Sequence, residues 1–184
     1  ETISQYIEGI SWLESQGFKI YGAVIDGMRG LAQALYPIPV QMCQFHQILI
    51  TRRYLTQEPD LNASCELLSL VKSITQMDKE SFIDAFNEWY DRYKDVLNER
   101  IHDKRIKHHT PPYMRPRLRS AYLSLKRNMP LLWTFYDRPE TGLPNTNNGI
   151  EGLFSDIKSK LRAHRGISKD NRKKLLDEYI MRHY

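Results

Sequence analysis

Apolar residues recur at helical spacing through almost the whole chain, and only two short apolar runs are compatible with strands. The first covers residues 19–25 and the second covers residues 40–42. Residues 28–35 between them predict a short helix, which Pro37 and Pro39 end. A strand, a helix and a second strand form a right-handed crossover unit, so we expect an α/β chain with a small parallel sheet, mostly α overall.

The remaining segments predict helices. One covers residues 2–16 and stops at Gly17, residues 44–136 are almost entirely helical, and two more cover 148–164 and 168–183, the last capped by Ser168. A linker, Thr110-Pro111-Pro112, and a loop at 139–148 interrupt them. The apolar faces expected to point inward are Leu67, Leu68, Val71 and Ile74; Phe82, Ala85, Phe86, Trp89 and Tyr93; Leu118, Ala121, Tyr122 and Leu125; and Ile150, Leu153, Phe154, Ile157 and Leu161.

Charge is distributed unevenly along the chain. Residues 1–100 carry nine Lys or Arg against 14 Asp or Glu, whereas residues 101–184 carry 18 against eight. A basic half indicates an anionic partner, most commonly nucleic acid, although a solvated basic surface gives the same pattern. Two cysteines provide no disulfide framework, and no apolar run approaches the length of a membrane span.

Two acidic residues lie where a metal-dependent nuclease places its ligands. Asp26 ends the first apolar run, and Glu151 stands 125 residues later at the start of a helix. Open α/β sheets form their sites at the carboxyl ends of their strands, which favours Asp26 as a ligand. Asp26 could equally be a turn residue before Gly27, and Glu151 could simply favour the positive end of its helix.

Two basic clusters accompany these acids. Arg119 and Lys126 lie seven positions apart on one predicted helix face, where they could follow a phosphate backbone. Trp89 and Trp133 could stack on an extruded base, but packing in the core is the commoner role of tryptophan. The first cluster consists of Arg115, Arg117, Arg119, Lys126 and Arg127, and the second of Lys158, Lys160, Arg162, Arg165, Lys169, Arg172, Lys173 and Lys174. The candidate DNA-binding residues are Arg115, Arg117, Arg119, Lys126, Arg127, Lys158, Lys160, Arg162 and Arg165.

The spacing Cys43-x-x-His46 resembles half of a zinc site. A second Cys-x-x-Cys or His-x₃-His pair is missing from the sequence, and Cys65 stands alone. The residues themselves therefore favour a small buried cysteine after the second strand, with His46 packed or hydrogen-bonded at the start of the next helix.

With these residues in view, the chain resembles bacterial insertion-sequence transposases of the Mutator-like superfamily. The likeness covers nearly the whole chain and follows the order of the family's motifs. The matching stretches are Val24-Ile25-Asp26-Gly27-Met28-Arg29-Gly30-Leu31, Gln41-Met42-Cys43-Gln44-Phe45-His46-Gln47, Arg117-Leu118-Arg119-Ser120-Ala121-Tyr122 and Pro144-Asn145-Thr146-Asn147-Asn148-Gly149-Ile150-Glu151-Gly152.

The resemblance implies a ribonuclease-H-like fold in which Asp, Asp and Glu bind two Mg²⁺ or Mn²⁺ ions. Asp26 matches the family's second Asp and Glu151 its Glu; Cys43, His46 and Asn148 match its other signature positions. It also implies three parts: a partial core over residues 1–46, a helical insertion over 47–140 and core helices over 141–184. The expected function is DNA cleavage and strand transfer in the bacterial cytoplasm, at the nucleoid, by a homo-oligomer acting on transposon ends and target DNA.

The sequence departs from the family at one point, because it contains no Asp before Asp26. The first acid and the first three strands are therefore expected in a longer reading frame, or the copy has decayed. This piece alone is expected to hold a two-strand remnant with one poorly covered face and to lack catalysis. Rival hypotheses are a non-catalytic DNA-binding remnant, a helical interaction protein with structural acids, and a related nuclease on the same fold.

Overall fold

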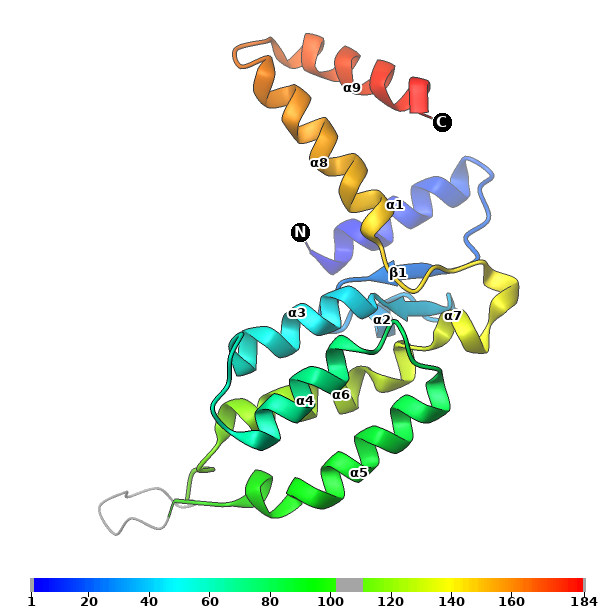
Figure 1. Cartoon of the computed structure of the whole chain (residues 1–184). Coiled ribbons are helices and arrows are strands. Elements are labelled where there is room, and N and C mark those ends of the chain that lie inside the picture. The colour runs from blue at the N-terminus through cyan, green and yellow to red at the C-terminus, as the bar shows by residue number, and fades with distance from the viewer. Residues whose placement is uncertain (1, 102–110, 184) are drawn as a thin grey trace. The chain divides into compact units, whose positions relative to one another are not determined.

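The computed structural model of this chain describes residues 2–101 and 111–183. These residues are mostly helical, and β1 (Ala23–Ile25) and β2 (Val40–Met42) form a small parallel sheet (Figure 1). The expectation of a mostly α chain with a small parallel sheet is therefore confirmed, and the ribonuclease-H-like core stays a prediction. The chain divides into two compact units, Glu1–Thr146 and Asn147–Tyr184, which are described one at a time. The three-part division with borders after residues 46 and 140 stays a prediction.

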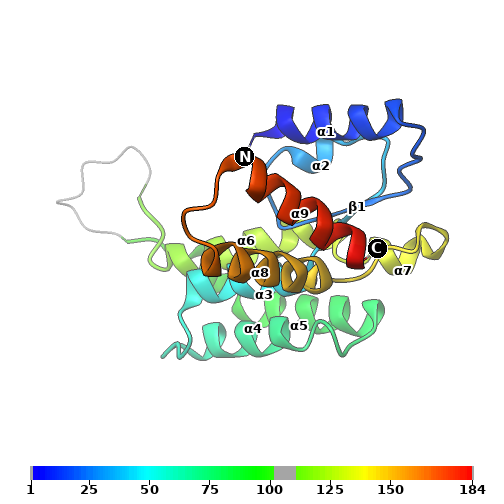
Figure 2. The ribbon, with the colours of Figure 1, turned by 90° about the horizontal axis from the view of Figure 1, so that it is seen from above.

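Helix α1 (Ile3–Ser15) has well-defined signals at both ends. Thr2 and Gln5 form a reciprocal capping box at its start. At its end, the backbone N–H of Gly17 donates to Glu14 and that of Phe18 donates to Leu13, as in a Schellman motif. The helix and its predicted stop are therefore confirmed. In Figure 2, α1 lies beside α2 (Leu31–Ala34), and the two helices are in contact.

The sheet is shorter than the apolar run predicts. Ala23 pairs with Val40 and Ile25 with Met42, and the three residues of β2 leave no partner for residues 19–22 among the described residues. The predicted strand over 19–25 is therefore too long by four residues. β2 is buried throughout, whereas Ala23 and Val24 of β1 are only half-buried, in keeping with an incompletely covered sheet.

Helices α3 (Gln44–Leu55), α4 (Asn62–Lys72), α5 (Lys79–Asn98) and α6 (Pro116–Asn128) run side by side below the sheet in Figure 1. Their apolar faces share one hydrophobic core with the sheet residues Ile25 and Met42. An aromatic cluster stands at its centre, where the Trp89 ring stacks on Phe86 and Tyr122. The inward residues predicted for 67–74 and 118–125 are all buried. Thr110 of the predicted linker lies outside the described residues.

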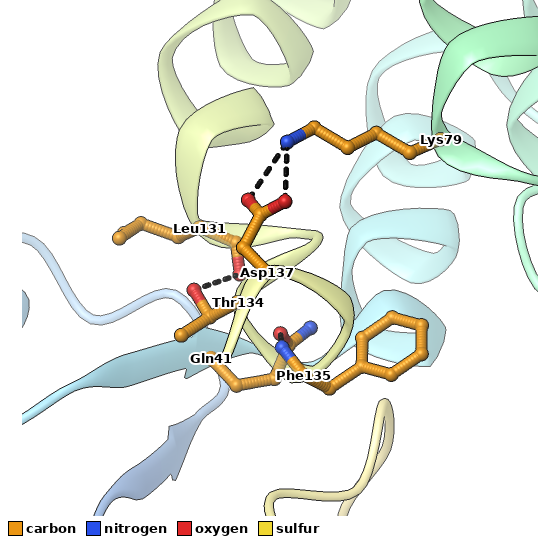
Figure 3. A network of polar contacts seen from close by, with 6 residues as sticks. All are labelled: Gln41, Lys79, Leu131, Thr134, Phe135 and Asp137. Atoms are coloured by element: carbon orange, nitrogen blue, oxygen red, sulfur yellow. Dashed lines mark hydrogen bonds and ion pairs between the residues drawn. The ribbon is translucent and has the colours of Figure 1, made fainter. Parts of the chain in front are cut away.

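Helix α7 (Thr134–Asp137) is hydrogen-bonded to β2. The Thr134 hydroxyl donates to the Val40 carbonyl at 2.7 Å, and the Phe135 N–H donates to the Gln41 side chain at 3.0 Å. Lys79 at the start of α5 pairs with both carboxylate oxygens of Asp137, at 2.6 and 2.8 Å (Figure 3). The sheet is thus held against the helical part by polar contacts as well as by the core.

The second unit consists of α8 (Asn148–Ala163) and α9 (Lys169–His183). The Ser168 hydroxyl accepts a hydrogen bond from the Asn171 N–H at 3.3 Å, which confirms it as the cap of α9. Ile157 of α8 and Tyr179 of α9 are buried, while Ile150 and Phe154 of the predicted apolar face are more than half exposed. Among the described residues, none of the helices offers an apolar stretch long enough to span a membrane.

Candidate nucleic-acid interface and carboxylate positions

Asp26 immediately follows β1, at the carboxyl end of the strand. Its side chain is exposed, and its Oδ1 atom accepts a hydrogen bond from the Met28 N–H at 3.3 Å. This contact is that of a turn residue, so the structural interpretation of Asp26 has direct support. An exposed carboxylate at a strand end is also accessible to a cation and to DNA.

Gly27 shapes the turn after this acid. Its φ angle is +97°, and a Cβ atom there would lie 2.8 Å from Met42 Cε and 3.2 Å from Ile50 Cδ1. A left-handed backbone with this little space accepts glycine readily and other residues only with strain. The direction in which the chain leaves Asp26 therefore depends on Gly27.

We expect Gly27→Ala to lower the free energy of unfolding by about 1–3 kcal/mol, because the left-handed backbone and the contact with Met42 both penalise a side chain. Gly9→Ala is the matched control: Gly9 lies inside α1 with open space around it, and this change should raise stability by roughly 0.5–1 kcal/mol. Urea unfolding followed by circular dichroism measures both. Equal stability of the two variants would contradict the strained turn.

A hollow of about 370 Å³ opens beside the turn after Asp26. Arg29 from that turn and Arg127 from α6 line it together, although they are 98 positions apart. Its other walls are mainly apolar, with Met28, Met42 and Leu131 among them. Both arginines are exposed, so the hollow combines cationic and apolar surface next to the candidate acid.

Glu151 lies in the first turn of α8 and is exposed. Its backbone N–H donates to the Asn147 carbonyl at 3.1 Å, and the signature residue Asn148 is the first residue of the helix. The expected position of Glu151 at a helix start is thus confirmed. Asp26 belongs to the first unit and Glu151 to the second.

Cys43 connects the sheet to α3. It is fully buried, and its N–H donates to the Ile25 carbonyl at 2.8 Å, which continues the pairing of β1 and β2. The sequence-based interpretation of Cys43 as a small buried residue is therefore confirmed. His46 is half-buried on α3, with its ring edge-on to Phe45. In the described part of the chain, His, Cys, Asp and Glu form no group of three that could hold a metal ion.

Buried amides around Cys43 form a network that the sequence analysis missed. The Gln41 and Gln44 side chains both donate to the Leu132 carbonyl at 3.0 Å, and Asn128 donates to Gln47 at 2.8 Å. Asn145 donates to the Gln44 side chain at 3.1 Å, and its carbonyl accepts from the Gln44 N–H at 3.0 Å. The segment that leads to α8 is thereby tied to the start of α3.

The basic residues of the first cluster have different environments. Arg119 is half-buried, its guanidinium 4.0 Å from the Tyr113 ring and hydrogen-bonded to Asn98 at 2.8 Å. Arg115 is half-buried near Glu99, whereas Arg117, Lys126 and Arg127 are exposed. Arg119 has a packing role that its position on the helix face did not predict. DNA binding by this cluster stays a prediction.

The second basic cluster surrounds the turn between α8 and α9. Lys158, Arg162, Arg165 and Arg172 line a hollow of about 360 Å³. Lys160 does not line it: its ammonium lies 3.5 Å from Asp156 and 4.9 Å from the centre of the Tyr179 ring. The second cluster therefore contains cations that line a common hollow and one cation, Lys160 of α8, that contacts the Tyr179 ring of α9.

Trp89 and Trp133 are 3% and 2% exposed, so both belong to the core and neither can stack on a base in this structure.

Comparisons with protein-family models, with curated proteins and with solved structures found no match for this chain. The function of the chain has to be argued from its own acids, its two arginine-lined hollows and its charge.

Proposed function

We propose that the chain is part of the catalytic domain of a Mutator-like DNA transposase, in which Asp26 and Glu151 help to bind Mg²⁺ for DNA cleavage and strand transfer. In this proposal, β1, β2 and α8 belong to a ribonuclease-H-like core, and the helices between them are its insertion. A third carboxylate, outside this sequence, completes the ligand set. The chain alone is then inactive, and the longer protein acts on transposon ends and target DNA.

The observation that carries the proposal is that the segment before Glu151 is hydrogen-bonded, within the first unit, near the strand end that carries Asp26. The carbonyl of Ile25, just before Asp26, accepts a hydrogen bond from the Cys43 N–H. Gln44, which follows Cys43, forms two hydrogen bonds with Asn145. Asn145 precedes Glu151 by six residues, so the covalent chain alone keeps Glu151 within roughly 20 Å of Asn145. The segment that leads to Glu151 is thus tied, within the first unit, to the strand end that carries Asp26. This supports one metal site with ligands 125 positions apart in the sequence.

The donor set suits a hard divalent cation. Both side chains are carboxylates, both are exposed, and oxygen ligands with partial hydration are what Mg²⁺ prefers. When bound, two such ions polarise the scissile phosphate, activate the attacking water or 3′-hydroxyl and stabilise the leaving oxygen. The expected role of Asp26 and Glu151 is to hold these cations at the strand to be cut.

In the proposal, Arg29 and Arg127 bind the DNA substrate. Their guanidinium groups share the hollow beside Asp26 and can each form paired hydrogen bonds with a phosphate. The apolar wall formed by Met28, Met42 and Leu131 can contact a sugar or a base. A nucleotide held there would place its phosphate at the strand end that carries Asp26.

A cleavage assay tests the proposed activity. The full-length protein is mixed with labelled DNA that carries both ends of the element, with Mg²⁺ or with EDTA. We expect nicks at the element ends that leave a 3′-hydroxyl, and these should depend on Mg²⁺. DNA that is bound but remains intact at every Mg²⁺ concentration would contradict the catalytic proposal.

The second candidate function is a DNA-binding module without catalysis. It is favoured by the basic hollow of the second unit, which contains no carboxylate among its lining residues and needs no metal to bind an anion. This alternative predicts salt-sensitive duplex binding that is the same with Mg²⁺ and with EDTA, and no cleavage by the full-length protein.

A further inference from the structure

The hollow at the turn between α8 and α9 has the features of an anion site. Lys158, Arg162 and Arg165 follow one another at four- and three-residue spacing along α8 and its end, and Arg172 approaches from α9. Leu161 and Ile167 form its apolar part. Four cationic side chains from two helices and their turn therefore face one space.

These four cations have no carboxylate partner in the part of the chain that the structure describes. Among the described residues, none of the ion pairs involves Lys158, Arg162, Arg165 or Arg172, whereas Lys160 on the same helix is paired with Asp156. Like charges at this helical spacing repel one another and destabilise the helix slightly. Because these cationic side chains repel one another and have no carboxylate partner among the described residues, binding of an external polyanion would stabilise them.

We infer that this hollow binds the sugar-phosphate backbone of duplex DNA, independently of any metal ion. The choice of DNA as the bound anion rests on the proposed function. The expectation that the hollow binds an anion rests only on its cationic lining. Guanidinium groups match the geometry of phosphate oxygens and can hold them through two parallel hydrogen bonds. The apolar part fits the deoxyribose between successive phosphates. Contacts of this kind position DNA and do not read its sequence.

The site differs from the sequence-based assignment in two residues. Arg172 joins it from α9, and Lys160 leaves it because Asp156 and Tyr179 hold its ammonium. A stripe along α8 alone would follow a single edge of the backbone. A hollow with cations from both helices surrounds a phosphate from two sides, which a linear stripe cannot do.

The test compares two double variants of the whole 184-residue chain. Arg162→Ala with Arg165→Ala removes two charges from the hollow, and Lys173→Ala with Lys174→Ala removes two exposed charges of α9 that do not line it. Binding to a short labelled duplex is measured by fluorescence anisotropy over a range of NaCl concentrations, in EDTA. Circular dichroism verifies that both variants keep their helices.

We expect the arginine variant to raise Kd by about tenfold or more. It should also reduce the slope of log K against log salt by about 1–2, because each lost phosphate contact removes roughly 0.9 from it. The lysine variant should change both quantities much less. Arg162→Lys with Arg165→Lys should retain the salt slope, because its charge is unchanged, while binding more weakly than the arginines.

The outcomes separate this inference from the proposed function. If the arginine and lysine variants lost DNA affinity equally, the inferred site in the hollow would be wrong. The cleavage assay would still decide on catalysis. Wild-type chain that binds no duplex DNA at low salt, or that prefers single-stranded RNA in competition, would overturn the DNA site and weaken the proposed function with it. Loss of binding in the arginine variant together with no cleavage by the full-length protein would support the hollow and reject only catalysis.

Discussion

Asp26→Asn and Glu151→Gln are each expected to lower the rate of Mg²⁺-dependent DNA cleavage by the full-length protein on the order of 10³-fold or more. Each change replaces a carboxylate by a neutral amide of nearly the same shape, so it removes the negative charge of the proposed metal ligand and changes the shape of the side chain little. Asp26 and Glu151 are both exposed, and we therefore expect both variants to fold normally. Nicking of end-labelled element DNA measures the rate.

Asp84→Asn and Glu88→Gln are the matched controls. Both residues are exposed on α5, so the same chemical changes should leave cleavage within about twofold of wild type. Duplex binding by Asp26→Asn should be unchanged or tighter, since the change removes a negative charge next to Arg29. Cleavage at the wild-type rate by either acid variant would exclude that acid as a metal ligand.

Trp89→Ala should lower the free energy of unfolding by about 3–5 kcal/mol, the range for removing a buried large aromatic residue. The Trp89 ring is 3% exposed, stacks on Phe86 and Tyr122, and donates its Nε1–H to the Ala63 carbonyl at 3.0 Å. Its loss leaves a cavity where α4, α5 and α6 meet and removes the hydrogen bond to the Ala63 carbonyl. Urea unfolding followed by circular dichroism measures the change.

Trp12→Ala is the control for this change, because Trp12 on α1 is 62% exposed. The same substitution there should alter stability by about 0.5 kcal/mol or less. If the two tryptophan variants unfolded at similar urea concentrations, the aromatic cluster would not be the centre of the core.

The helices could be predicted from the sequence because their signals are local. Apolar spacing identified the inward faces of α4, α5 and α6, and Ser168 and Gly17 marked a helix start and a helix end. The strands were harder to predict, because a strand ends where its partner ends. The apolar run at 19–25 contains no sign that β2 is only three residues long.

The acids of the candidate site could also be placed from the sequence, at a strand end and in a first helical turn. Their connection could not. It depends on the buried side chain of Gln44 and the half-buried side chain of Asn145, and polar residues at such positions look like surface residues in a sequence. The only local signal was the three-residue spacing of Gln41, Gln44 and Gln47, which places amides beside Cys43.

Charge patterns predicted where cations occur but not what each one does. Arg119 and Lys160 looked equivalent to their neighbours, yet one packs on Tyr113 and the other pairs with Asp156. Arg127 was a candidate from the sequence and Arg172 belonged to the second basic cluster, but only the fold shows which residues each of them shares a hollow with. Three-dimensional neighbours, which a linear pattern does not contain, decide whether a basic residue is structural or available to a ligand.

Iron-directed cleavage of the polypeptide tests most directly whether Asp26 and Glu151 share a cation. Fe²⁺ replaces Mg²⁺ in the full-length protein, with and without element DNA, and ascorbate with peroxide generates radicals that cut the backbone near the bound metal. We predict cuts beside both acids in the same sample, all suppressed by excess Mg²⁺ and by Asp26→Asn. Cuts beside only one acid, or cuts that Mg²⁺ does not suppress, would contradict the shared metal site.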